Sequence, residues 1–228
     1  MYWRLGDYDN TALWMNNIAR LVPDPEAARV YRGWAFIAQR DFENARREFG
    51  RPTLNNGLYW LGVFYLGSLD TAKGRADDAI ERYKDFSISQ IGKYNTHFYF
   101  GIAAIKAYQA SGEQQKAQAL IDEMISVIEA NPSADYHDSA IHDASIYALS
   151  GQEETAIAIL EEWVNRGGAT SLLQQDTRHG LGGLTDNPRY QSIFRTVNNR
   201  LSEQKANLAR WETSGEMLPM PREVTDPQ

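Results

Sequence analysis

The chain of 228 residues contains no cysteine. A disulfide framework, a thiol nucleophile, a redox-active thiol pair and a zinc site built on thiolates are therefore all excluded. Proline is also scarce, with eight residues, so few positions interrupt a helix. No apolar run approaches the roughly 18 residues that cross a membrane, and residues 1–7 lack the basic-then-apolar order of a signal peptide. The sequence therefore predicts no membrane insertion.

Basic residues are fewer than acidic ones, 23 against 30, which gives a formal net charge of −7. Nucleic-acid binding depends on cations that neutralise phosphates, so this balance argues against it. The basic residues near the C-terminal end lie on different faces of the predicted helix and do not form one stripe, so we interpret them as solvated charges. These residues are Arg189, Arg195, Arg200, Lys205 and Arg210. We predict no direct contact with nucleic acid.

Aromatic residues are plentiful, with six Trp and twelve Tyr, and small and large residues recur with a period of 34. Gly33 and Ala45 return one period later as Gly67 and Ala79, and Thr11 stands one period before Ala45. The large residues that accompany these positions are Met15, Phe36, Phe49, Leu66 and Tyr83. A fixed period of this length indicates tandem helical hairpins, in which small residues lie where two helices cross closely.

This pattern resembles the tetratricopeptide repeat. The resemblance implies an all-α fold, a right-handed superhelix of hairpins. Tight turns are expected at residues 40–41 and 73–75, where Gly74 suits a left-handed backbone conformation. In the later part of the chain the alanine spacing lengthens to 38 and then 39, at Ala117 and Ala156.

The periodicity predicts helices separated by short turns. They span residues 7–21, 26–38, 41–50, 55–70, 75–88, 95–110, 113–130, 136–149 and 153–166. We therefore expect a solenoid of about four and a half hairpins over residues 1–166, followed by C-terminal capping helices and an extended tail over residues 167–228. The first hairpin begins at its second helix. We expect the chain to be a fragment of a longer protein, and a bare N-terminal face makes a homodimer possible.

The C-terminal region is predicted to end in one long helix. Asn187 and Pro188 suit its N-cap and first helical position, and Gly215 suits its end. One apolar stripe follows it, formed by Tyr190, Ile193, Phe194, Val197, Leu201, Leu208 and Trp211. A solenoid needs its last apolar face covered, so this helix is predicted to be a cap. A short helical stretch is expected before it, around residues 171–178.

A second resemblance lies in residues 150–221, carried by Leu184 to Gln191, Gln204 to Glu212 and Gly215 to Pro219. This segment looks like the end of tetratricopeptide regions in bacterial multidomain signalling proteins, namely membrane-tethered winged-helix transcriptional regulators and class III adenylate cyclases. The resemblance implies a sensory or partner-binding part of a regulator, on either the cytoplasmic or the periplasmic side. A stand-alone scaffold that binds an apolar peptide is the alternative, and a domain associated with a cyclase is another.

Residues suited to catalysis are not arranged for it. Residues 180–183 lack the strand and the lysine of a phosphate-binding loop, and His137 and His142 point about 140° apart on a helix, too far to share a metal. Asp138 and His142 have helical i, i+4 spacing, which we interpret as a hydrogen bond. Acidic pairs such as Asp77-Asp78 suit helix starts. We therefore predict no enzyme activity, no cofactor and no metal.

A ligand is expected to bind along the first helices of the hairpins, which line the concave groove of a tetratricopeptide solenoid. Counting from the small residues gives a groove that is aromatic and apolar, with one cation and one histidine, and that suits an apolar or proline-containing peptide. The predicted contacts are Tyr31, Trp34, Phe64, Tyr65, Tyr99, Lys106, Asp138 and His142. Two alternatives remain open: these aromatics pack between hairpins, or the C-terminal helix or tail covers them.

Overall fold

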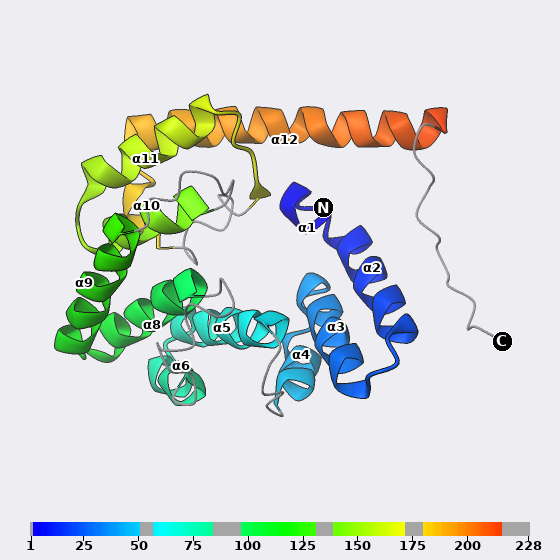
Figure 1. The fold of residues 1–228 in the computed structure, drawn as a ribbon, viewed down its shortest axis with the longest axis horizontal. Coiled ribbons are helices and arrows are strands. Elements are labelled where there is room, and N and C mark those ends of the chain that lie inside the picture. Colours follow the sequence, from blue (N-terminus) through cyan, green and yellow to red (C-terminus); the bar gives the residue numbers. More distant parts are fainter. Residues whose placement is uncertain (1, 51–56, 84–96, 131–138, 172–179, 216–228) are drawn as a thin grey trace. The chain divides into compact units, whose positions relative to one another are not determined.

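The computed structural model describes residues 2–50, 57–83, 97–130, 139–171 and 180–215 (Figure 1). No strand occurs in these ranges, so the predicted all-α class is confirmed. The helices are α1 (Tyr2–Leu5), α2 (Tyr8–Leu21), α3 (Pro25–Ala38), α4 (Phe42–Phe49), α5 (Gly57–Ala72), α6 (Ala76–Tyr83), α8 (His97–Ser111), α9 (Gln114–Ala130), α10 (Ser139–Leu149), α11 (Glu153–Asn165) and α12 (Pro188–Ser214), with a 3-10 turn η3 (Gly182–Leu184).

The observed helices follow the predicted ones within a few residues. Residues 55–56, 84–88, 95–96, 136–138 and 172–178, which were also predicted to be helical, lie outside the described ranges, as do residues 216–228 of the predicted tail. The chain divides into two compact units: residues 1–62 with 199–228, which we call unit 1, and residues 63–198, which we call unit 2. Helices α5 and α12 each contribute residues to both units.

The same turn closes five helical hairpins. In the α5–α6 turn, the Gly74 N–H donates to the Thr71 carbonyl at 3.0 Å and the Arg75 N–H donates to the Asp70 carbonyl at 2.8 Å. These two bonds form a Schellman motif, which satisfies carbonyls at a helix end and requires one residue with positive φ. The motif recurs at the α1–α2, α3–α4, α8–α9 and α10–α11 turns.

The residue with positive φ is a glycine at four of these turns and an arginine at the fifth. The glycines are Gly6, Gly74, Gly112 and Gly151, with φ between 69° and 83°, and the arginine is Arg40, with φ of 60°. The first three, Gly6, Arg40 and Gly74, are 34 residues apart, so the turns carry the period of the sequence. Because a side chain strains this conformation, Arg40 destabilises its turn relative to glycine.

Helices of neighbouring hairpins pack in sequence. Helix α2 contacts α3 in unit 1, and in unit 2 α6 contacts α8 and α9 contacts α10. The positions predicted to be small are buried, since Ala45, Ala79 and Ala156 are inaccessible to solvent. This succession of contacts is typical of tandem hairpins.

Glycines on α3 and α5 make room for aromatic rings, as the sequence predicted for Gly33 and Gly67. A Cβ atom at Gly33 would lie 2.6 Å from the Phe49 ring, and one at Gly62 would lie 2.3 Å from the same ring. A Cβ atom at Gly67 would lie 2.1 Å from the Tyr83 hydroxyl. Phe49 therefore fills the space that two glycines leave in unit 1.

Helix α12 begins as predicted, because the Asn187 side chain accepts the Arg189 N–H at 2.9 Å. Its apolar stripe is buried at Tyr190, Val197 and Leu208, whereas Trp211 is 43% exposed. Arg189 is exposed, as expected for a solvated charge, but it also pairs with acidic side chains of α11. Its guanidinium donates two hydrogen bonds of 2.8 Å to Glu161 and one of 2.7 Å to Glu154, which joins the start of α12 to α11 within unit 2.

Replacing Arg40 with glycine is expected to raise the free energy of unfolding by about 0.5–1 kcal/mol, because glycine adopts positive φ without strain. The matched change Gly74→Arg introduces that strain at the equivalent turn and should lower it by about 1 kcal/mol. The expected loss of stability in Gly74→Arg does not come from a steric clash, since no atom lies within 4 Å of a Cβ at Gly74. Urea denaturation measures both changes, and a loss of stability in Arg40→Gly would contradict this account.

Gly33→Ala is expected to lower the free energy of unfolding by about 1–2 kcal/mol, because overpacking against Phe49 outweighs the higher helix propensity of alanine. In a Phe49→Leu background the ring is gone, and the same change should be neutral or stabilising. A double-mutant cycle by chemical denaturation measures this coupling. Additive effects of the two changes would show that the ring does not set the size limit at residue 33.

Candidate functional site

The predicted groove residues fall in both units of the structure. Unit 1 holds Tyr31 and Trp34, whereas unit 2 holds Phe64, Tyr65, Tyr99, Lys106 and His142. Asp138 lies outside the described residues. The two groups are therefore considered separately.

In unit 1 the predicted groove residue Trp34 belongs to a chain of aromatic rings. Its ring centroid lies 5.5 Å from that of Trp3 and 6.3 Å from that of Phe49, and Trp3 lies 5.3 Å from Tyr8, all edge to face. Trp34 and Tyr31 both keep part of their surface exposed. Trp34 therefore contributes to packing as well as to the surface. A substitution of Tyr31 is better suited to test ligand contact without a change in this packing.

In unit 2 two of the predicted contacts are buried. Phe64 is 2% exposed and packs against Tyr83 and Phe100, with centroid distances of 5.8 and 5.4 Å. His142 is 5% exposed, and its ring lies 4.4 Å from that of Tyr99. Phe64 fits the alternative that these aromatics pack between hairpins. The other three, Tyr65, Tyr99 and Lys106, are partly exposed.

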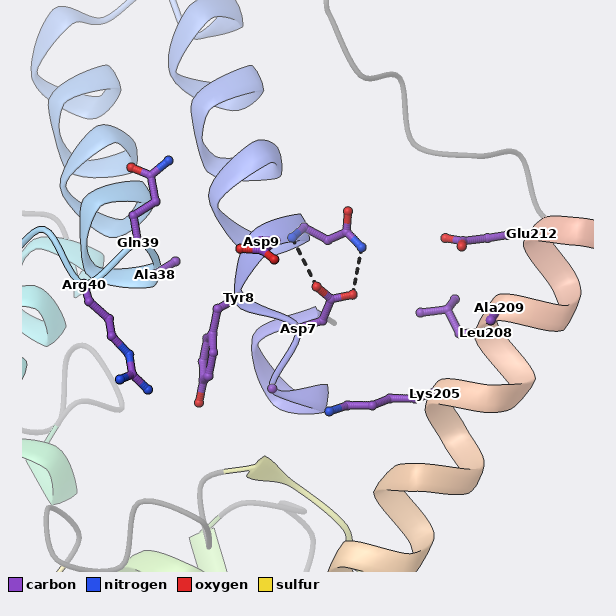
Figure 2. A pocket seen from close by; sticks show the side chains of 12 residues that line it. Asp7, Tyr8, Asp9, Ala38, Gln39, Arg40, Lys205, Leu208, Ala209 and Glu212 are labelled. Atoms are coloured by element: carbon purple, nitrogen blue, oxygen red, sulfur yellow. Dashed lines mark hydrogen bonds between the residues drawn. The ribbon is translucent and has the colours of Figure 1, made fainter.

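A pocket of about 580 Å³ lies within unit 1, at the hairpin turns (Figure 2). Its walls are the α1–α2 turn at residues 6–10, the end of α3 and the following turn at residues 38–40, and one face of α12. The residues of α12 that line it are Lys205, Leu208, Ala209 and Glu212. The volume is in the range of pockets that bind small ligands or a few side chains.

Charges of both signs line this pocket. In Figure 2 Arg40 and Tyr8 lie on one side of the α1–α2 turn, whereas Lys205 and Glu212 extend from α12 on the other side, and Asp7 and Asp9 belong to the turn side of the pocket. Arg40 and Lys205 come from different elements, the α3–α4 turn and α12. Three carboxylates, those of Asp7, Asp9 and Glu212, and two cations therefore line the pocket.

The acidic side chains of the pocket already have roles in the fold. Asp7 caps α2, accepting the Asn10 N–H at 3.2 Å and the Asn10 amide at 2.7 Å. Asp9 lies in the first turn of α2, where the helix dipole favours a negative charge. Glu212 accepts a hydrogen bond from Tyr2. Burial raises the pKa of Tyr2, and the negative charges of Glu212 and Asp7 raise it further.

The two cations differ from these acids. Neither the Arg40 nor the Lys205 side chain has a hydrogen-bond or ion-pair partner within the part of the chain that the structure describes. Both are exposed to solvent. Arg40 and Lys205 therefore add cationic donors to a pocket that also holds the Gln39 amide.

Sequence reasoning missed this pocket. Arg40 was predicted only as a turn residue, and Lys205 as a solvated charge. The signal that could have drawn attention to Arg40 is its place in the period, because Gly6 and Gly74 occupy the equivalent positions 34 residues before and after it. Nothing local in the sequence places Lys205 near residues 6–40.

No group of three or more His, Asp or Glu side chains in the described ranges is arranged to hold a metal ion. Among the described helices, none combines the length and the apolar character needed to cross a membrane. Comparison of the chain with protein-family models, with curated proteins and with solved structures finds no match.

Proposed function

We propose that this chain is a non-catalytic interaction module of the tetratricopeptide type, which binds a protein or peptide partner. The observation that carries the proposal is the Schellman turn that closes five successive hairpins, with the first three 34 residues apart. Tandem hairpins expose a long surface built from equivalent positions of each repeat, and such surfaces are used to bind other proteins. A superhelical arrangement of the hairpins is part of this proposal.

Partly exposed aromatic side chains support a binding role. Tyr31 on α3, Tyr65 on α5 and Tyr99 on α8 each stand on the first helix of a hairpin. Tyrosine combines apolar area with a hydroxyl group and loses little conformational entropy on binding, so it often contributes much of the affinity of an interface. These tyrosines are the proposed anchors.

The non-catalytic part of the proposal is supported by the uses of the acidic pairs. Asp77 and Asp78 lie in the first turn of α6, and Glu153 and Glu154 lie in the first turn of α11. Negative charges at these positions interact favourably with the helix dipole. Glu161 pairs with Arg189, whose hydrogen bonds hold the pKa of that carboxyl below its usual range. These carboxylates stabilise helices and their packing.

The resemblance of residues 150–221 to bacterial signalling proteins adds a context to the proposal. The resemblance implies a sensory or partner-binding region that accompanies an output domain. The proposed role is therefore that of the sensory or partner-binding part of a transcriptional regulator or a cyclase.

The test replaces proposed anchors and measures capture of a partner. We expect Tyr31→Ala and Tyr65→Ala together to weaken retention of a partner protein at least tenfold, because hot-spot tyrosines each contribute about 2 kcal/mol. Helical circular dichroism should be unchanged. Glu123→Ala, an exposed change on α9, is the matched control and should retain the partner fully.

Equal retention of the partner by the double variant and by the Glu123→Ala control would contradict the proposed binding surface. If the chain instead turned over a substrate by itself, the non-catalytic role would be wrong.

A further inference from the structure

Helix α2 carries large apolar side chains that its own unit does not cover. Trp14 is 43% exposed and Leu21 is 53% exposed, and among the described residues only Trp211 on α12 is a comparably exposed large apolar side chain. Trp14 and Leu21 are seven residues apart, so they lie within about 20° of each other on one side of the helix. Such a surface gains free energy when a partner removes it from water.

Two charges of opposite sign border this apolar surface. Asp9 and Arg20 are both exposed, and neither side chain has a hydrogen-bond or ion-pair partner in the part of the chain that the structure describes. They are eleven residues apart, which is three turns of helix to within about 20°, so they form a second line along α2. Leu13, which is partly exposed, lies between the two lines. The exposed face of α2 therefore combines apolar side chains with an acid near one end and a base near the other.

This face is complementary to itself. When two copies of α2 lie antiparallel about a two-fold axis, each line of one helix meets the same line of the other helix in reverse order. Asp9 then faces Arg20 of the second copy, and the converse pair forms by symmetry. In that register the axis passes between residues 14 and 15, so Trp14 lies against Trp14 of the second copy. The charges and the tryptophan thus favour the same alignment.

The charges also exclude the parallel alignment. A parallel pair of α2 helices would place Asp9 beside Asp9 and Arg20 beside Arg20, and like charges repel. Helix α2 has 14 residues and is about 21 Å long. A contact through this helix alone is smaller than a standard protein interface, so we expect a dimer that dissociates on dilution.

We propose that the exposed face of α2 binds a second copy of this chain in antiparallel orientation, with Trp14 at the two-fold axis and Asp9 paired with Arg20 across it. The proposed tyrosine anchors stand on other helices, so this inference does not rest on the proposed function. A dimer would carry each anchor twice, and a partner with two matching segments would bind it more tightly than the single chain.

The test uses two charge reversals in the full chain, Asp9→Lys and Arg20→Glu. Each variant alone places like charges opposite each other, and we expect it to dimerise at least tenfold more weakly than the native chain. A mixture of the two variants pairs the introduced lysine with the introduced glutamate and Arg20 with Asp9. The mixed dimer should therefore form about as tightly as the native one.

Sedimentation equilibrium measures these dimers at protein concentrations from about 10 to 500 μM, the range suited to a weak interface. One variant carries a tag of different mass, which distinguishes the mixed dimer from either variant alone. Recovery in the mixture shows that both variants are folded. Arg195→Glu, which reverses an exposed cation of α12, is the charge control and should change dimerisation less than twofold.

Trp14→Ser should weaken the native dimer at least tenfold, because a buried tryptophan at the centre of an interface contributes much of its affinity. Trp211→Ser is the matched control, since Trp211 is also 43% exposed but belongs to α12, and it should change dimerisation less than twofold. Helical circular dichroism should be the same in both variants.

Three results would overturn the inference. The first is a native chain that stays monomeric over the whole concentration range, which would assign the α2 face to another occupant. The second is a mixture of the charge variants that associates no better than either variant alone. The third is an equal loss of dimer in Trp14→Ser and Trp211→Ser, which would place the contact elsewhere.

Discussion

The hairpins depend on one local constraint, a residue with positive φ that lets the chain reverse between two helices. In each of the five turns the following residue donates its N–H to the carbonyl five positions earlier, so the end of one helix and the start of the next are fixed together. The next helix then begins with its own cap, as with Asp7 and Asp41, whose side chains both accept from an asparagine three residues later. At the first two turns, turn, cap and helix start therefore form one repeated unit, whereas α11 begins after Gln152 without a side-chain cap.

Packing between the helices of a hairpin depends on unequal side-chain sizes. Phe49 and Tyr83 occupy space that Gly33, Gly62 and Gly67 leave open. Close packing of this kind tolerates neither a larger residue at the glycines nor a void in place of the ring. It also explains why aromatic residues predicted as ligand contacts, such as Phe64, are found in the core instead.

The sequence predicted the helices and turns well because their signals are local. A turn glycine and the asparagine and proline at the start of α12 are each recognised from a few neighbouring residues, and the period of 34 repeats local signals of this kind along the chain. Long-range contacts were missed for the same reason. Arg189 meets Glu154 and Glu161 35 and 28 residues away, and Lys205 lines a pocket with Arg40, so no spacing rule places these charges together. The groove prediction had a further weakness, because a shift of one residue rotates every assigned side chain by about 100°.

The open space around the turn glycines means that the chirality of the residue, and not a steric limit, decides which amino acids these positions accept. A Cβ atom at Gly74, Gly112 or Gly151 would meet no other atom within 4 Å, so only the chirality of an L-residue opposes a side chain there. A mirror-image amino acid has the opposite preference and adopts positive φ readily. At these three turns D-alanine, introduced by chemical synthesis, would therefore match the backbone conformation of the folded chain and restrict the unfolded one.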